Sequence, residues 1–472
     1  MTLLVLLLFI VCFIALSWRR FEWAALLTVF SLPLYTVRFS LGVPTTLLEI
    51  MILLLFAVWF LKNRQALFKR VPANLERLKE KKPLLNQYPW RGQIIFWLLV
   101  SYLAVGVASW SWPALGLWRA YFLEPILLFI VIVNTFKNKE SLIRLLTILG
   151  LSGALTALLA VYQFMVGGLE TYTLKDFFVR QHELRAVSLF AYPNAVGLYA
   201  GPLAVILFGL FLYWLKVKKH CYAILSLLAV LVSILGIMAA RSEGALLASL
   251  VCLLIILFFA GKKFRIVATI ITIALVVVIT SIPALSSYTK DRLLLRDVSG
   301  QIRRAQWSET VEMMQDKTHR VLLGVGLGNY QKALEPYHID GIFVKDYSDP
   351  DYQRKVLFNE EYHKQAWQPL EIYLYPHNVI LNFWTELGFL GVLAFIWLLV
   401  AYFKEGYLAT KKYLKEKKAF AMITLALTLA MATSMIHGLV DVPYFKNDLS
   451  ALFWILMAVM AVVKIRREKK IN

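Results

Sequence analysis

The sequence has little cysteine and comparatively little acidic charge. Its three cysteines, Cys12, Cys221 and Cys252, lie in or beside apolar segments. An odd number of cysteines in such places implies no disulfide framework, and their spacing matches no cysteine-based metal site. The chain has 29 acidic residues against 50 lysines and arginines, a formal net charge of +21. Because the basic residues flank apolar runs, this excess does not indicate a nucleic-acid partner.

The sequence also lacks an internal repeat of fixed period and a low-complexity segment. Transporters built from inverted repeats have related halves, so this absence argues mildly against that architecture. The first 17 residues are apolar, but they have no basic leader and no small-residue cleavage site, and Arg19 and Arg20 follow them. This pattern predicts an uncleaved first membrane span rather than a signal peptide.

Long apolar runs are what the sequence has in abundance. Hydrophobic residues make up 60% of the 472, and the mean hydropathy is +0.67, well above the level of soluble domains. Runs long enough to cross a bilayer fall near residues 1–17, 21–37, 45–61, 93–110, 115–136, 145–168, 187–215, 221–240, 244–260, 266–284, 377–403, 419–440 and 449–463. We therefore expect an all-α, polytopic transmembrane helix bundle of 12 or 13 spans, the first two forming a short hairpin.

The positive charges predict the orientation of the bundle. Connections on one side hold 31 of the 50 lysines and arginines, including the stretch from Lys62 to Arg91, and the positive-inside rule makes this side cytoplasmic. The opposite side has two longer connections, residues 169–186 and 285–376. The second is nearly charge-balanced, with 12 basic and 13 acidic residues, so it is not a basic docking arm.

This second loop is too long for a plain connection. Residues 301–317 have the pattern of an amphipathic helix, and Gly324, Gly326 and Gly328 indicate a tight turn after it. We expect a small extracytoplasmic helical cap between the tenth and eleventh spans. The predicted domains are thus an N-terminal bundle (1–284), the cap (285–376) and the C-terminal transmembrane helices with a basic cytoplasmic tail (377–472).

The stretch from Tyr375 to Gly391 is the best candidate for chemistry. Pro376 suits a helix start, and a polar stripe of Asn378, Asn382, Thr385 and Glu386 recurs at helical spacing in an otherwise apolar span. Such a stripe must face a bundle interior or a wet cavity, because exposing it to lipid costs several kcal/mol. His377 precedes the stripe, where the positive end of the helix dipole favours a neutral base. The alternative is a merely hydrogen-bonded interfacial histidine.

Four other polar groups fall on the same predicted side. Arg185 precedes Pro193 and Asn194 at a helix start that we expect to be broken or re-entrant. Arg241 lies in a short turn with Glu243. The two residues are equally consistent with a site that binds an anion and with an ordinary turn held by a salt bridge. The remaining two are Arg303 with Arg304 at the start of the amphipathic helix, and His437 with Asp441, four residues apart and within reach across one helical turn.

Arginines beside a neutral histidine suit one task in particular, which is to hold a diphosphate while a hydroxyl is deprotonated. Guanidinium binds phosphate oxygens bidentately and remains charged, so it stabilises a departing diphosphate without a metal. The histidine would take the hydroxyl proton. A competing signal is Asp349 with Asp351, since such a pair can hold Mg²⁺ or Mn²⁺, but no further acidic residues cluster with it.

Together these stretches resemble the O-antigen ligase and polymerase superfamily, bacterial membrane glycosyltransferases similar to the GT-C class. The resemblance covers residues 145–463 and rests on five features: His377-Asn378 with Glu386, Gly388 and Gly391; Arg185 with Pro193-Asn194; Arg303 with Trp307; residues 323–330; and the pair His437 and Asp441. One departure is Glu243, because the family often has Ser-Arg-Gly-Ala where this chain has Ser242-Glu243-Gly244-Ala245.

The resemblance implies a metal-independent, inverting glycosyltransferase of the cytoplasmic membrane with its active site on the extracytoplasmic face. By that likeness His377 is the catalytic base, and Arg185, Arg303 and, in place of the missing family arginine, Arg241 hold the diphosphate. The supporting residues are Asn194, Asn378, Glu386, His437 and Asp441. The resemblance further implies no cofactor, a polyprenyl-diphosphate donor such as undecaprenyl diphosphate-linked glycan, and a glycan, lipid or protein acceptor in cell-envelope polysaccharide biosynthesis.

Three functions stay open on the sequence alone. The first is glycan transfer, either ligation of a finished glycan or polymerisation of repeat units. The second is a transporter or flippase for a lipid-linked or charged sugar, for which polar residues inside the membrane are equally expected. The third is a non-catalytic membrane protein that binds glycans through its cap. Transport predicts functional charges near the bilayer midplane, whereas transfer predicts them at the outer rim, where most of the charges named above fall.

Overall fold

Helices account for almost all regular structure in the computed structural model, which describes residues 3–469 apart from 41, 43, 69–87 and 167–184. Most of the predicted basic stretch from Lys62 to Arg91, and the predicted outer loop from residue 169 to 184, lie outside the described residues. Strands are confined, in the described part, to two antiparallel pairs of three residues each. The prediction of an all-α polytopic bundle is confirmed.

Each of the thirteen predicted apolar runs lies on a helix. The bundle elements are α1 (Leu3–Arg19), α2 (Phe21–Phe30), η1 (Leu32–Thr36), β1 (Arg38–Ser40), β2 (Pro44–Thr46), α3 (Leu47–Phe68), α4 (Arg91–Val107), α5 (Trp112–Trp118), η4 (Arg119–Leu123), α6 (Glu124–Thr135), α7 (Lys139–Met165), α8 (Pro193–Lys216), α9 (His220–Ala239), α10 (Glu243–Phe259), α11 (Lys262–Ser281), α18 (Val379–Lys415), α19 (Ala421–His437) and α20 (Asn447–Lys469).

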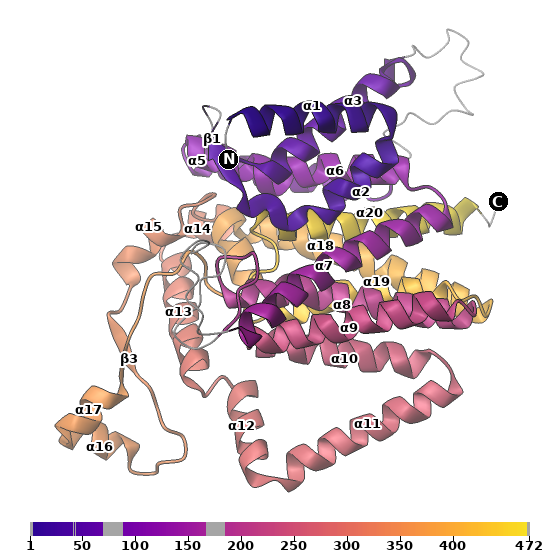
Figure 1. Cartoon of the computed structure of the whole chain (residues 1–472). Coiled ribbons are helices and arrows are strands. Elements are labelled where there is room, and N and C mark those ends of the chain that lie inside the picture. The colour runs from indigo at the N-terminus through magenta and orange to yellow at the C-terminus, as the bar shows by residue number, and fades with distance from the viewer. Residues whose placement is uncertain (1–2, 41, 43, 69–87, 167–184, 470–472) are drawn as a thin grey trace.

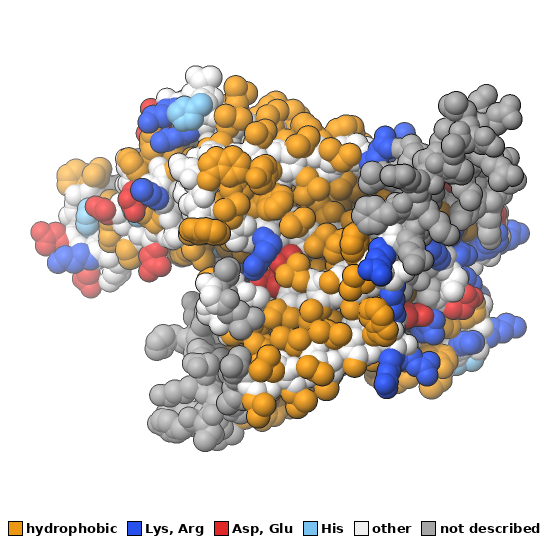
Figure 2. Space-filling view, turned by 90° about the horizontal axis from the view of Figure 1, so that it is seen from above, with side chains coloured by type: hydrophobic (Ala, Val, Ile, Leu, Met, Phe, Trp, Pro, Cys, Tyr) orange, Lys and Arg blue, Asp and Glu red, His pale blue; other side chains and the backbone are white. Residues whose placement is uncertain are grey.

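Seven helical segments of the described chain are long and apolar enough to cross a membrane, and five further apolar helices are shorter. The surface agrees with this composition. Figure 2 shows a broad band of hydrophobic side chains across the middle of the molecule, with lysines and arginines gathered beyond one end and charges of both signs beyond the other. This is the surface of a multi-pass membrane protein.

The core lies around α8 and α20, which are buried along nearly their whole lengths. Small residues let the helices approach closely, as membrane packing requires. A Cβ added to Gly236 of α9 would lie 2.6 Å from the backbone of Ala157 in α7. By contrast, α11 has a single buried residue, Ala268, and diverges from the bundle below α10 in Figure 1. Its apolar surface therefore faces lipid on almost every side.

One buried ion-pair group ties the N-terminal helices to the C-terminal one. Arg119 contacts Glu49 at 2.8 Å and Glu124 at 3.1 Å, and the Asn447 amide donates to Glu49 at 2.6 Å. These residues come from η4, α3, α6 and α20. Because breaking a buried pair leaves an uncompensated charge, the group fixes the relative positions of four elements.

The segment between α11 and α18 forms the expected helical cap at one end of the bundle (Figure 1). Its elements are α12 (Pro283–Leu293), α13 (Val298–Gln315), α14 (Thr318–Leu323), α15 (Tyr330–Leu334), η5 (Glu335–Tyr337), β3 (Gly341–Phe343), α16 (Tyr352–Phe358), α17 (Glu360–Ala366) and β4 (Trp367–Pro369). The predicted amphipathic helix is α13. The predicted tight turn follows α14, where Gly324, Gly326 and Gly328 all have φ between 77° and 88°.

This glycine turn is inserted into a kink of α18. Gly388 interrupts the helix with φ 72°, and the Thr385 carbonyl that it frees accepts from the Val325 amide at 2.7 Å. The Gly328 amide donates to Glu386 at 2.7 Å. The cap is therefore attached to the membrane helix that follows it by backbone contacts, and α18 holds the cap in place.

The predicted break near the start of α8 lies earlier than its prolines suggested. The helix begins at Pro193, where a proline at the first position has no unsatisfied N–H, and it continues through Pro202. The irregular backbone is the segment 185–192, which the Gln163 side chain satisfies by accepting from the amides of Val187 and Ser188. The end of this span is thus irregular, whereas the first proline starts the helix and the second is accommodated in it.

Candidate functional site

Five membrane helices and the cap helix α13 bring their ends together at the cap side of the bundle. These ends are the starts of α8, α10 and α18 and the ends of α9 and α19. The Val379 amide at the start of α18 donates to the Gly438 carbonyl after α19 at 2.8 Å. The Ala186 amide, before α8, donates to the Ala239 carbonyl at the end of α9 at 3.0 Å. The polar residues singled out in the sequence lie in this junction.

His377 lies in a strained turn immediately before α18. Its φ is 47°, a left-handed conformation that costs energy for a non-glycine residue. Two contacts hold the turn: the Trp307 indole N–H donates to the Pro376 carbonyl at 2.7 Å, and Asn378 caps α18 by accepting from the Ile380 and Leu381 amides. Surrounding structure that maintains such strain often marks a functional residue.

The His377 imidazole is half-buried between two aromatic rings and lies within the electrostatic influence of Arg303. The rings of Tyr373 and Tyr375 lie 5.0 and 5.1 Å from it, centroid to centroid. Burial, and then the positive charge of Arg303, lower the pKa of His377 from 6.5 to about 4. Its Nδ1 is buried without a hydrogen-bond partner among the described residues. The ring is therefore a neutral imidazole at pH 7, with a nitrogen that protein groups leave unsatisfied.

Arg303 reaches the junction from the first turns of α13. One of its terminal nitrogens donates to Ser299 at 2.9 Å, while its buried Nε has no hydrogen-bond partner in the described part of the chain. Its charge acts on His377 and also on Asp441. A buried guanidinium N–H without an acceptor is costly, so a bound anion with acceptor oxygens would fit this position.

Arg185 is joined to the same group through Asn194 and Asp441. Its guanidinium donates to Asn194 Oδ1 at 2.9 Å and to the carbonyls of Ala240 and Arg241 at 3.1 and 3.4 Å. Asn194 in turn interacts with the buried Asp441, whose pKa burial raises against the opposing effects of the Val442 amide, Arg303 and Asn194. The structure thus brings Arg185, Arg303 and His377, far apart in sequence, into one polar network.

Arg241 and His437 lie at the border of this network. Arg241 has φ 49° and an exposed side chain, and it contributes its carbonyl to Arg185. His437 ends α19 and lies so close to α10 that a Cβ on Gly244 would be 3.0 Å from its ring. Because α19 ends there, Asp441 follows in a loop, and the expected contact between the two across a helical turn does not form.

The other two supporting residues, Asn378 and Glu386, form hydrogen bonds with backbone groups of neighbouring segments. Asn378 caps α18 and donates to the Leu439 carbonyl at 3.0 Å, which fixes the His377 turn against the loop after α19. Glu386 accepts from the glycine turn and lies more than two helical turns along α18 from His377. The stripe of Asn382, Thr385 and Glu386 is buried, so it faces the bundle interior as predicted.

Sequence reasoning missed a lysine and two tyrosines next to the site. The Tyr375 hydroxyl donates to the Tyr192 hydroxyl at 2.9 Å, and Lys446 Nζ lies 3.3 Å from the centre of the Tyr192 ring. Burial lowers the pKa of Lys446, and the charge of Asp448 opposes this shift. The sequence does contain a signal for Lys446: it is a lone cation between the last two apolar runs, on the side of the membrane with few positive charges.

The acidic pair in the cap is engaged locally. Asp349 accepts from Lys355 at 2.8 Å and from the Asp351 amide at 3.0 Å, an arrangement that stabilises the turn before α16. In the described residues, no three histidine, cysteine or acidic side chains gather in a way that could hold a metal ion. The arrangement at the junction instead offers two guanidinium groups for an anion and a neutral imidazole for a proton.

The comparison with protein families agrees with the motifs. Residues 228–396 match the family model described as O-antigen ligase, a range that includes Arg241, Arg303, His377 and Glu386 and leaves Arg185, His437 and Asp441 outside it. No curated protein matches the chain. The match supports the resemblance of this polytopic membrane chain to the O-antigen ligase superfamily over residues 228–396.

Proposed function

We propose that this protein transfers a glycan from a polyprenyl-diphosphate donor to an acceptor hydroxyl at the outer face of the cytoplasmic membrane. The observation that carries the proposal is the position of His377. A neutral, half-buried imidazole within the influence of Arg303, with a buried Nδ1 unsatisfied by described protein groups, is what the base of such a reaction requires. The family match and the rim position of the arginines support the same reaction class.

In the proposed reaction the acceptor oxygen attacks the anomeric carbon of the donor sugar. The O–H proton passes to a nitrogen of His377, a new C–O bond forms, and the bond from the anomeric carbon to the diphosphate oxygen breaks. The polyprenyl diphosphate leaves with that electron pair and the configuration inverts. The imidazolium then returns its proton to water.

The arginines stabilise the leaving group in this scheme. Negative charge develops on the diphosphate as the bond breaks, and charge-assisted hydrogen bonds from Arg303 and Arg185 strengthen with it. Arg241 is exposed at the rim and would reach the outer phosphate. The Asn194 and Asp441 side chains position Arg185.

Orientation follows from the distribution of charge along the molecule. The end opposite the cap holds the basic residues that follow α8 and α10 and those in the last turns of α18 and α20. By the positive-inside rule we take that end to be cytosolic. The cap and the junction would then face outward, where lipid-linked glycans are joined.

The test is transfer by purified protein in lipid nanodiscs supplied with polyprenyl-diphosphate-linked glycan. His377→Ala is expected to lower kcat by at least about 100-fold, the contribution typical of a positioned general base. His319→Ala, in α14 away from the junction, serves as the matched control and should retain activity. Full transfer by His377→Ala would remove the base assignment, and full activity in EDTA is expected because no step uses a metal.

A further inference from the structure

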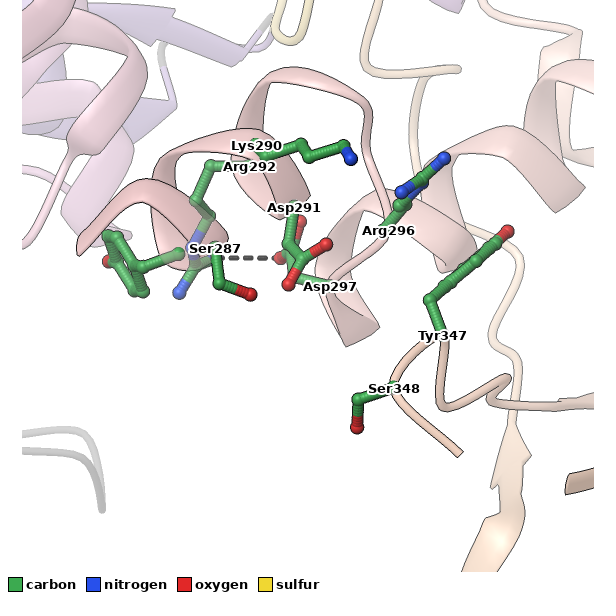
Figure 3. A pocket seen from close by; sticks show the side chains of 9 residues that line it. Ser287, Lys290, Asp291, Arg292, Arg296, Asp297, Tyr347 and Ser348 are labelled. Atoms are coloured by element: carbon green, nitrogen blue, oxygen red, sulfur yellow. Dashed lines mark hydrogen bonds and ion pairs between the residues drawn. The ribbon is translucent and has the colours of Figure 1, made fainter. Parts of the chain in front are cut away.

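A groove of about 390 Å³ lies beside the junction and has no part in the reaction proposed above. It opens between α12, the start of α13 and the cap loop that carries Tyr347. Figure 3 shows Ser287 at one end of it and Tyr347 with Ser348 at the other, with Asp291 and Asp297 between them. Its lining comes from two segments, residues 287–297 and 347–348, that are far apart in sequence, so the folded cap builds it.

The charges of the groove balance. Arg292 contacts Asp297 at 2.6 Å and Glu243 at 3.0 Å, a group with one net negative charge. Lys290 and Arg296 add two positive charges and Asp291 one negative charge. The lining residues alone carry three positive and two negative charges. Glu243, which contacts Arg292 but does not line the groove, brings the total to zero, so the groove does not select a strongly charged ligand, whether anion or cation.

Its polar groups alternate between donors and acceptors. The Asp291 carboxylate accepts, the Lys290 ammonium donates, and the Ser287 hydroxyl does both. The Ser348 hydroxyl, which donates to Asp346 at 2.6 Å, accepts. A ligand that carries several hydroxyls, each a donor and an acceptor, satisfies such a surface, whereas an apolar ligand would leave these groups unpaired. This pattern suits a sugar.

Two tyrosines at the groove are held in place and stay partly exposed. The Tyr288 hydroxyl donates to Glu243 at 2.6 Å, and Arg304 donates to the Tyr347 hydroxyl at 2.8 Å. The exposed fractions of Tyr288 and Tyr347 are 49% and 39%. Arg292 lies over the Tyr288 ring at 5.2 Å from its centroid, and Arg296 and Lys345 lie over the Tyr347 ring at 4.8 and 5.0 Å. These cations hold the rings in place, and the parts of the rings that stay exposed can contact a sugar at low cost in conformational entropy.

The groove connects to the junction through one short turn. Glu243, which binds both Tyr288 and Arg292, begins α10 two residues after Arg241. The Arg241 carbonyl accepts from Arg185 in the junction. A chain of sugars that starts at His377 and passes this turn therefore reaches the groove.

We propose that this groove binds neutral sugar residues of the glycan chain, some distance from its reacting end. The inference rests on the proposed function for the identity of the ligand, but binding does not require chemistry at His377. The groove would hold the chain along the cap while its end lies at the junction.

The experiment measures binding by the full-length protein in nanodiscs with saturation-transfer NMR. The probes are oligosaccharides released by mild acid from the surface polysaccharide of the cells that make this protein, separated into neutral and acidic pools. The wild type is expected to bind the neutral pool. Tyr347→Ala and Asp291→Asn should each weaken that binding about tenfold, the effect of one lost ring contact or carboxylate hydrogen bond. Tyr407→Ala is the matched control, since this tyrosine is exposed on α18 near its basic end.

Each outcome decides the inference. Unchanged binding by both groove variants, no binding of the neutral pool, or tighter binding of the acidic pool would overturn it. His377→Ala should bind the neutral pool like the wild type while failing in transfer. A His377→Ala protein that transfers normally removes the proposed function but leaves the groove result standing as sugar binding, so the two failures are distinguishable.

Discussion

At the scale of single residues, the pKa of His377 sets the pH dependence. A histidine with a pKa of about 4 stays neutral, and able to accept a proton, throughout the range in which an ordinary histidine with a pKa of 6.5 becomes charged. We therefore expect the acid limb of kcat/KM, which reports the free enzyme, to fall near pH 4. A bound diphosphate opposes the charge of Arg303, so the acid limb of kcat should lie at higher pH.

Measurement of both limbs from well below pH 4 up to pH 8 checks this prediction. Burial remains in the complex while the charge of Arg303 is countered, so a shift of the kcat limb upward is the expected sign. A kcat/KM limb at pH 6.5 would mean that the free imidazole is solvated and that the half-buried position of His377 is not its position in solution.

Arg303 is the residue whose loss should affect chemistry most after His377. Arg303→Gln removes a buried charge that would face the leaving diphosphate, and the expected loss of kcat is about 100- to 1000-fold. Arg303→Lys retains the charge but not the bidentate geometry, so its kcat should lie between those of the wild type and Arg303→Gln. Arg354→Gln, exposed on α16, removes the same charge elsewhere and should behave like wild type in the same nanodisc assay.

At the scale of elements, the junction of the glycine turn with α18 should be intolerant of side chains. A Cβ on Gly388 would lie 2.2 Å from the Leu322 carbonyl oxygen, and φ 72° is itself unfavourable for alanine. Gly388→Ala is expected to destabilise the protein by about 2–4 kcal/mol and lower its melting temperature in detergent. The control is Gly116→Ala in α5, where nothing lies within 4 Å of the added Cβ. An equal fall in the melting temperature of this variant would mean that the melting temperature is insensitive to the contact between the glycine turn and α18.

Sequence patterns identified the elements well and their irregularities less well. Each of the thirteen hydrophobic runs coincides with helical structure, and glycines at 324, 326 and 328 located the tight turn, because both patterns are local. The kink at Gly388 was not predicted. A glycine in an apolar helix is equally consistent with close packing, and only the insertion of a second segment at Thr385 distinguishes the two.

The same limit applies to the site. Residue types and helix ends indicated that Arg185, Arg303 and His377 would lie on one side, and the structure brings them into one network. Their roles stay predictions. The groove beside Tyr347 had no sequence signal, because its two halves come from residues 287–297 and 347–348, and no short-range pattern specifies which distant loops meet.

At the scale of the whole molecule, the two ends should face different compartments. Lys332 on the cap and Lys411 near the basic end of α18 are both exposed, which allows a matched pair of cysteine substitutions. The background requires Cys12, Cys221 and Cys252 to be replaced by serine, since two of them are exposed. A membrane-impermeant maleimide applied to intact cells then reports which end is outside.

The Lys332→Cys protein is expected to react in intact cells, and the Lys411→Cys protein only after permeabilisation. The physical reason is that moving the basic loops across the membrane during insertion is unfavourable, whereas the charge-balanced cap crosses at lower cost. Labelling in the reverse order would place His377 and its arginines in the cytosol. A base there would meet nucleotide-activated sugars before any flipped lipid-linked glycan, so the reverse result would contradict the donor, the compartment and the role of the cap together.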